Sequence, residues 1–279
     1  MRRSETGILS QFATLFLRNG ELFFRDKKKL ISSLLVPVVI GTLVVIVCRE
    51  KFMDNYEDTG GTIYAIISVA IYLGMFNSLF AICKERRIIK REYMTNMRLV
   101  SYVTALAAFQ LFICLAQSAI YMVIYWIQMD FPTGGLVIHS GFWEYLISLF
   151  LVVYVSDLMG MVISAASSSS EMAILVAPVV IAVQMVFSGV YFALSDNAKK
   201  VSVITVSKWG MEAMGSTARL NGLELMVQKA FPMVPHEADS AFTATAAHVT
   251  HAWGVMGLFI LVFLVLCIII LKGVEKDGR

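Results

Sequence analysis

Charged residues are scarce in this chain of 279 residues. Asp, Glu, Lys and Arg make up 15% of it, hydrophobic residues make up 58%, and the mean hydropathy is +0.75. Soluble domains carry about one quarter charged residues, so this composition excludes an ordinary soluble domain. The formal net charge is only +3. The basic residues cluster at the ends of long apolar runs, where they would face anionic lipid headgroups, so nucleic-acid binding is not expected.

Cysteine is also rare, and the chain lacks the common metal and hydrolase motifs. Its four cysteines lie within or at the edges of apolar runs, which offers no disulfide framework, and no CxxC pair suggests a metal. HExxH and Ser/His/Asp arrangements are absent. His248 and His251, with His236, Glu237 and Asp239 nearby, are interpreted as solvated groups at a wet interface. No metal site is expected.

What the chain has in abundance is long apolar runs. About 20 helical residues cross the hydrocarbon core of a bilayer, and each run meets or nearly meets that length. The sequence therefore predicts an all-α integral membrane protein with six transmembrane helices. The predicted spans are 30–48, 62–83, 99–127, 144–167, 172–194 and 252–272.

The connections between the runs differ in positive charge. Residues 1–29 carry seven Lys and Arg and residues 84–98 carry six, whereas 128–143 carry none. Because basic loops stay on the cytoplasmic side, both termini are predicted to be cytoplasmic. The long segment 195–251 is then extracytoplasmic. Its apolar and aromatic residues predict short helices that dip into or lie on the outer leaflet.

Two segments outside the spans are predicted to be helical. Within 1–29, apolar residues at helical spacing predict an amphipathic helix in the membrane interface, or alternatively a helix packed on a soluble partner. Residues 84–98 contain no Gly or Pro and carry both signs of charge. They predict either a short helix that docks on a cytoplasmic partner or a basic loop that only enforces topology.

Polar residues inside the spans are the candidate binding groups. A carboxylate at the centre of a span costs about 2.5–3.5 kcal/mol, so Asp157 is a functional hypothesis, unless Ser156, Gln110 or Gln117 hydrogen-bonds it. Asn77 and Gln184 are more typical of hydrogen bonds between helices. A stripe of small residues predicts close helix packing in the fourth span. The stripe comprises Ser156, Gly160, Ser164 and Ser168.

Ordered motifs along nearly the whole chain resemble one membrane-protein family. Two of these motifs, Glu85-Arg86 and Arg91-Glu92, lie in the charged segment 84–98. The others include Arg25-Asp26, Gly41-Thr42-Leu43, Ser101-Tyr102, Leu158-Met159-Gly160, Glu171-Met172-Ala173, Phe187-Ser188-Gly189, Trp209-Gly210, Glu212-Ala213 and Asn221-Gly222. With these motifs in this order, the chain is similar to the transmembrane domain of type-2 ABC exporters, most closely the G subfamily of half-transporters. The charged segment resembles the coupling helix of that family.

The resemblance implies roles for particular residues. The coupling helix 84–98 and the 168–171 hairpin would contact a nucleotide-binding domain. In the first of these elements the residues are Glu85, Arg86, Arg91 and Glu92, and in the second they are Ser169 and Glu171. Asn77, Asp157 and Gln184 would lie along the translocation path, with Phe187 and Tyr191 on its outer side.

The chain departs from the family in three respects. It has no GxxxxGK[ST] phosphate loop, so ATP and Mg²⁺ would be bound by a partner nucleotide-binding domain. Its outer segment has no cysteine, which favours a bacterial inner membrane. Asp157 replaces a residue that is usually uncharged.

These features predict a transport subunit rather than an enzyme. It would be the permease of an ATP-driven exporter, would pair with a second copy or a paralogue, and would move an amphipathic or lipid-like substrate. One alternative is an ion channel or gradient-driven carrier that uses Asp157. Another is a membrane-embedded enzyme of lipid or cell-wall synthesis, which would need clustered acidic or His residues at one membrane face.

Overall fold

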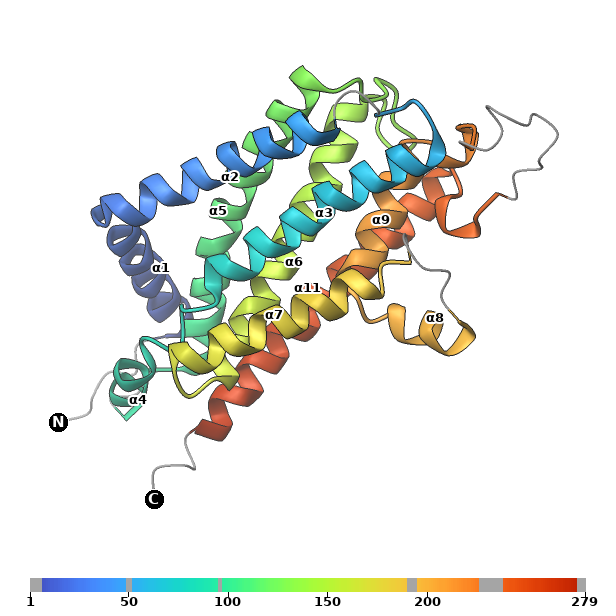
Figure 1. The fold of residues 1–279 in the computed structure, drawn as a ribbon. Coiled ribbons are helices and arrows are strands. Elements are labelled where there is room, and N and C mark those ends of the chain that lie inside the picture. Colours follow the sequence, from blue (N-terminus) through green and yellow to red (C-terminus); the bar gives the residue numbers. More distant parts are fainter. Residues whose placement is uncertain (1–6, 49–51, 95–96, 190–194, 226–237, 275–279) are drawn as a thin grey trace.

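The structure is a computed structural model, and it describes residues 7–48, 52–94, 97–189, 195–225 and 238–274. All regular secondary structure in these ranges is helical (Figure 1). The α-helices are α1 (Ile8–Arg25), α2 (Lys27–Cys48), α3 (Tyr56–Ser78), α4 (Arg86–Met94), α5 (Leu99–Gln128), α6 (Gly141–Ala166), α7 (Ser170–Val186), α8 (Asp196–Ser202), α9 (Val206–Thr217) and α11 (Ala246–Val274). Two short 3-10 helices, η2 (Leu220–Gly222) and η3 (Ser240–Phe242), lie between α9 and α11.

Five helices are long and apolar enough to cross a membrane, and they are α2, α3, α5, α6 and α11. Each coincides with a predicted span, which confirms an all-helical protein with several membrane-spanning segments. The fifth predicted run, 172–194, forms the shorter apolar helix α7 of 17 residues. Residues 190–194 of that run lie outside the described residues.

Helix α6 is the central helix of the bundle. It packs against α3, α5, α9 and α11, and most of its side chains are buried. By contrast, few residues of α2 and α11 are buried inside the protein. These two helices therefore have the apolar surface that lipid would cover.

The small residues of α6 allow α3 to approach closely. A Cβ atom added at Gly160 would overlap the Met75 carbonyl oxygen, and one at Gly74 would overlap the Val153 carbonyl oxygen. The Ser164 hydroxyl accepts hydrogen bonds at 3.0 Å from the backbone N–H groups of Ile82 and Cys83. The predicted packing stripe is thus the α3–α6 contact, although its last member, Ser168, lies beyond the end of the helix and is exposed.

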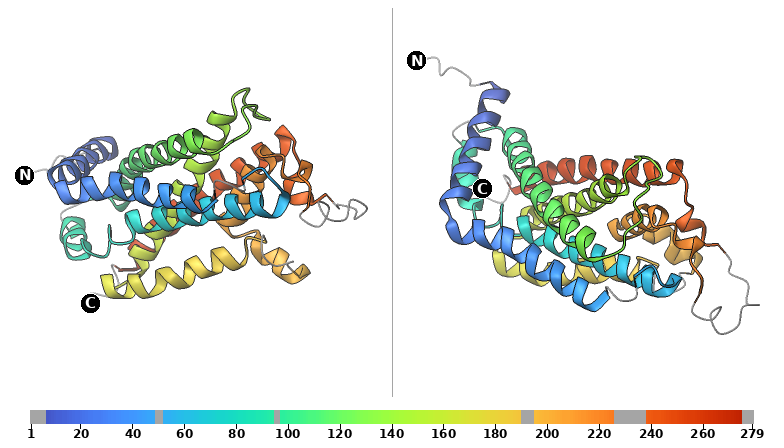
Figure 2. Two further views of the ribbon diagram at one scale, coloured as in Figure 1. Left: turned by 45° about the horizontal axis from the view of Figure 1, so that its top comes forward. Right: turned by 90° about the horizontal axis from the view of Figure 1, so that it is seen from above.

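Helix α1 lies across one end of the long helices, as both views show (Figures 1 and 2). Part of its apolar face packs on α5 rather than on a surface outside the protein. Phe16 and Phe23 make edge contacts with Phe109, at centroid distances of 6.1 and 5.5 Å. The Asp26 carboxylate then accepts a hydrogen bond from the Lys29 N–H at the start of α2.

The two ends of the molecule are named after the short helices that lie there (Figure 1). The α4 end contains α1, α4 and the end of α11. The α9 end contains α8 and α9.

The α3–α6 contact leads to a prediction for Gly160→Ala. The added methyl group should destabilise the folded protein by about 1–3 kcal/mol, because backbone on the facing helix cannot yield without shifting the whole helix. Thermal unfolding in detergent measures this change. Gly254→Ala in α11 is the matched control, since nothing lies within 4 Å of its added Cβ. Equal melting temperatures for the two variants would contradict the proposed packing.

Candidate functional site

Helix α4 has one face against the bundle and one face free. Ile89 is buried, and Tyr93 packs partly against the core. The opposite face projects away from the long helices at the α4 end (Figure 1). Its exposed residues are Arg87, Ile88, Lys90, Arg91 and Met94.

One arginine of α1 joins α4 to the rest of the protein. Arg18 Nη1 donates to both carboxylate oxygens of Glu92, at 2.8 and 3.1 Å, and its Nη2 lies 3.5 Å from Glu85 Oε2. The Tyr102 hydroxyl of α5 donates to the same Glu85 oxygen at 3.5 Å. A surface ion pair contributes little to the free energy of folding by itself. A guanidinium that binds two carboxylates, however, also fixes the position of α4 relative to α1. Arg18, Glu85, Glu92 and Tyr102 are called the Arg18 elbow below.

The connection between α6 and α7 is also tied to α4. Arg86 Nη1 donates to the Ser167 carbonyl oxygen. The Ser169 hydroxyl caps α7 by accepting a hydrogen bond from the Met172 N–H at 3.3 Å. Glu171, in the first turn of α7, is exposed. Displacement of α4 would therefore act on α1, α5 and the α6–α7 connection together.

The six residues predicted to meet a nucleotide-binding domain thus fall into two groups. Glu85, Arg86, Glu92 and Ser169 bind other parts of this chain, whereas Arg91 and Glu171 are exposed. Sequence reasoning missed Arg87, Ile88 and Met94, which share the exposed face with Arg91. Their helical spacing, opposite Ile89 and Tyr93, was the available signal.

Asn77 and Gln117 form a reciprocal amide pair inside the bundle. Asn77 Nδ2 donates to Gln117 Oε1 at 2.6 Å, and Gln117 Nε2 donates to Asn77 Oδ1 at 3.2 Å and to the Ser33 carbonyl oxygen at 3.0 Å. The pair joins α2, α3 and α5. Asn77, Gln117 and Gln110 also line a cavity of about 240 Å³ whose other walls include Lys29 and Phe76.

Asp157 is completely buried and does not line that cavity. The Ser78 hydroxyl donates to its main-chain carbonyl oxygen. Neither carboxylate oxygen accepts a hydrogen bond of good geometry from the described residues. The partners suggested by the sequence are engaged elsewhere or are themselves unbonded, because Gln117 binds Asn77 and the Ser156 hydroxyl has no partner.

Gln184 connects α7 to α9. Its side-chain oxygen accepts hydrogen bonds from the Val206 N–H at 2.7 Å and the Ser207 N–H at 3.3 Å, so it caps the start of α9. Phe187 follows the last residue of α7 and is partly buried. Tyr191 lies outside the described residues. Among the described residues, neither Gln184 nor Phe187 lines the cavity that Asn77 lines.

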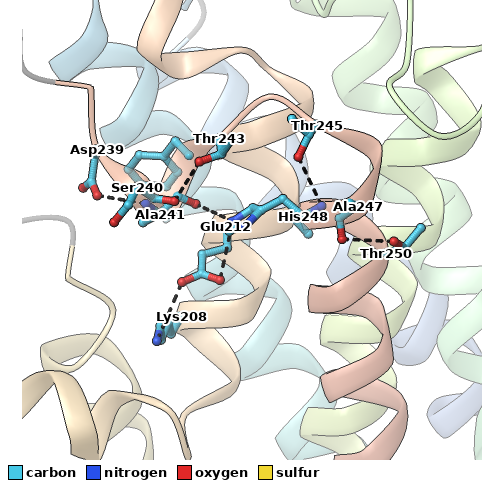
Figure 3. Close-up of polar contacts among 12 residues, drawn as sticks. Lys208, Glu212, Asp239, Ser240, Ala241, Thr243, Thr245, Ala247, His248 and Thr250 are labelled. Atoms are coloured by element: carbon cyan, nitrogen blue, oxygen red, sulfur yellow. Dashed lines mark hydrogen bonds and ion pairs between the residues drawn. The ribbon is translucent and has the colours of Figure 1, made fainter.

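A charged cluster lies at the α9 end, around Glu212 (Figure 3). Glu212 Oε1 is 3.7 Å from Lys208 Nζ, and Glu212 Oε2 is 3.7 Å from His248 Nε2. Burial raises the pKa of Glu212, while the nearby Lys208 and His248 act in the opposite direction. Within the described ranges, no three His, Cys, Asp or Glu side chains are arranged to hold a metal ion. His236 and Glu237, which the sequence also suggested, lie outside those ranges.

These features define a multi-pass helical membrane protein with a charged elbow and a short exposed helix at one end. Comparison with known protein families identifies the family to which the chain belongs. Residues 10–217 match the ABC-2 type transporter family, so the chain belongs to that family and is an ABC transporter permease.

A relative of the chain supports this assignment. Over 253 residues the chain is 24% identical to the ABC transporter ATP-binding/permease protein Rv1747 of Mycobacterium tuberculosis. The match covers 87% of this chain but only 29% of that relative.

The Arg18 elbow gives a second prediction. Arg18→Ala removes the donors that Glu85 and Glu92 share, so α4 should separate from α1 and open more often. We expect backbone amides of α4 to exchange hydrogen severalfold faster, as measured by mass spectrometry. Arg25→Ala is the control, because Arg25 is exposed in the last turn of the same helix. Unchanged exchange in α4 of the Arg18 variant would show that the elbow does not hold it.

Proposed function

We propose that this chain is the membrane-spanning subunit of an ATP-driven exporter, and that α4 receives the force of ATP hydrolysis. The observation that carries this proposal is the Arg18 elbow. A partner that pushes on the exposed face of α4 would move α1 and α5 through Arg18 and Tyr102. The same push would reach the α6–α7 connection through Arg86.

The motor would be a separate or fused nucleotide-binding domain that binds ATP and Mg²⁺. This chain has no phosphate loop, whereas its mycobacterial relative is named as both ATP-binding and permease. We expect Arg87, Ile88 and Arg91 of α4, together with Glu171, to meet that domain. Exposed apolar and basic residues on one short helix suit a groove that has an acidic rim.

A second transmembrane subunit, identical or paralogous, would complete the translocation path. Helix α7 supports this part of the proposal, because within this chain it buries only Ala173, Ala177 and Gln184. Its other faces are exposed and almost wholly apolar. At 17 residues, α7 is about 26 Å long, close to the hydrocarbon thickness, and it would be the fifth of six spans.

In this arrangement the α4 end faces the cytoplasm, because the described parts of the basic segments, residues 7–29 and 84–94, both belong to it. Both termini would then be cytoplasmic and the α9 end extracytoplasmic, in a bacterial inner membrane. The path would pass Asn77, Gln184, Phe187 and Tyr191. Its apolar surroundings favour an amphipathic or lipid-like substrate, as in the G subfamily of half-transporters.

The test of coupling is co-purification with the ATPase, followed by substrate-stimulated ATP hydrolysis in lipid vesicles. Ile88→Asp should weaken the complex by about tenfold, because it places a charge in an apolar contact. Lys27→Gln, at the start of α2 and away from α4, should have no effect. Full-speed transport by the purified chain alone, without nucleotide, would overturn the proposal.

A channel or gradient-driven carrier remains the second candidate, because the Asp157 carboxylate is buried without a good hydrogen bond. Such a group can carry a proton or bind a cation when the path opens.

We predict that Asp157→Asn alters transport or substrate preference and leaves assembly intact. Transport rates in vesicles and the elution volume of the complex measure the two effects. Ser156→Ala is the control, since the Ser156 hydroxyl is equally buried and also lacks a partner. Wild-type transport by a well-expressed Asp157→Asn protein would remove the functional hypothesis. A variant that loses gradient-driven flux but is indifferent to ATP would favour the carrier.

A further inference from the structure

A cavity of about 410 Å³ lies at the α9 end, apart from the Arg18 elbow and from the amide pair of Asn77 and Gln117. Its walls come from several parts of the chain. Helix α8 contributes Lys199, α9 contributes Lys208, Met211 and Glu212, and the segment around η3 contributes Asp239 and Phe242. A cavity of this size accommodates a small organic headgroup.

The charges in these walls balance. Two basic residues, Lys199 and Lys208, and two acidic residues, Glu212 and Asp239, line the cavity. One Asp239 carboxylate oxygen accepts a hydrogen bond from the Ala241 N–H at 2.9 Å, which leaves the other oxygen for a ligand. A simple anion would be attracted by one pair and repelled by the other, and the same holds for a simple cation. A ligand that carries both signs satisfies both pairs. Lys199 is exposed, and its ammonium has no acidic partner among the described residues.

Glu212 is the wall residue whose surroundings most favour a bound cationic group. Its side chain is only 9% exposed. Lys208 and His248 each lie 3.7 Å away, too far for a hydrogen bond. His248 Nε2 is also 2.9 Å from the Ala241 carbonyl oxygen, which can only accept, so the hydrogen on that nitrogen is directed to Ala241. The carboxylate of Glu212 is therefore buried with unused acceptor capacity.

The wall opposite α9 is fixed before any ligand arrives. Asn221 Nδ2 donates to the carbonyl oxygens of Asp239 and Phe242, at 2.8 and 3.0 Å. His248 holds Ala241 from α11, as Figure 3 shows. Met211 and Phe242 are buried and supply an apolar surface beside the charges. A pre-organised site loses little entropy when it binds.

We propose that this cavity binds a zwitterionic phosphate–ammonium headgroup, either free or as part of an amphiphile. The ammonium would lie against Glu212 and Asp239. The phosphate, with several acceptor oxygens, would lie against Lys199 and Lys208. The glycerol or acyl portion would follow Met211 and Phe242. If the chain is the exporter subunit proposed above, this headgroup is its substrate class. Binding of the headgroup to the cavity does not itself need ATP.

The experiment measures binding by calorimetry to the purified full chain in maltoside micelles that contain no zwitterionic lipid. The probes are glycerophosphoethanolamine and lysophosphatidylethanolamine. Inorganic phosphate and ethanolamine are the single-charge comparisons. We expect at least one of the two zwitterions to bind about tenfold more tightly than either single-charge comparison. Binding of both zwitterions indicates headgroup recognition alone, and binding of only the lyso-lipid indicates that the apolar surface is also needed.

Two variants and one control locate the site. Glu212→Gln keeps the shape of the side chain and should weaken binding about tenfold. Lys199→Gln, at an exposed position that the fold does not need, should also weaken it. Lys200→Gln is the matched control, since its neighbour Lys199 lines the cavity and Lys200 does not. Equal affinities for wild type and Lys199→Gln, or equal binding of phosphate alone, would refute the assignment.

The result is separable from the proposed function. If the cavity binds no zwitterion but the ATPase complex still hydrolyses ATP in response to another amphiphile, only this inference fails. If no ATPase associates with the chain while the cavity binds as described, the exporter proposal fails and the binding site stands.

Discussion

The close approach of α3 and α6 is the contact on which the rest of the structure depends. Gly74 and Gly160 let the two backbones meet with no side chain between them, and Ser164 binds the chain where it leaves α3. That position determines where the turn at residues 79–85 begins and hence where α4 lies. The Arg18 elbow can form only because α4 is delivered to α1 in this way. A core contact in the middle of the bundle thus places a charged element at its end.

Polar side chains in the apolar interior are mostly used to join elements. Gln184 caps α9, and the Asn77–Gln117 pair joins three helices. Glu144 accepts hydrogen bonds from the backbone N–H groups of Leu136, Val137 and Ile138 and from the Thr217 hydroxyl. Inside a bilayer, where there is no water, each such hydrogen bond compensates for the hydration that the polar group loses on burial. Within the described ranges, Asp157 and Glu212 are buried carboxylates for which this compensation is incomplete, and each is therefore suited to a moving or bound ligand.

The two ends of the molecule have different chemistry. The α4 end presents basic and apolar side chains on a short helix that is held from three sides. The α9 end encloses a charge-balanced cavity whose walls are fixed by Asn221 and His248. Helices α3, α6 and α7 run between the two ends (Figure 1). Helix α7 is joined to both ends, because Arg86 binds the Ser167 carbonyl oxygen just before it and Gln184 near its end caps α9. Covalent bonds and packed contacts through α7 therefore connect α4 with the cavity at the α9 end.

The sequence by itself determined the helical class and the positions of the long apolar helices, because length, hydropathy and spacing are local properties. For 84–98 it left a short helix and a basic loop as alternatives, and the structure shows a helix at Arg86–Met94. It also predicted the packing stripe of α6, since small residues at four-residue intervals occupy one helix face. It did not reveal that Glu85 and Glu92 bind Arg18, or that Gln184 caps α9. Partners separated by 67 and 74 residues in the first case meet only after the bundle forms. Only the tertiary structure decided which charged side chains remain exposed on α4. It also brought Lys199, Glu212 and Asp239 together around one cavity. Both outcomes depend on how the helices are placed relative to one another, which the sequence pattern does not encode.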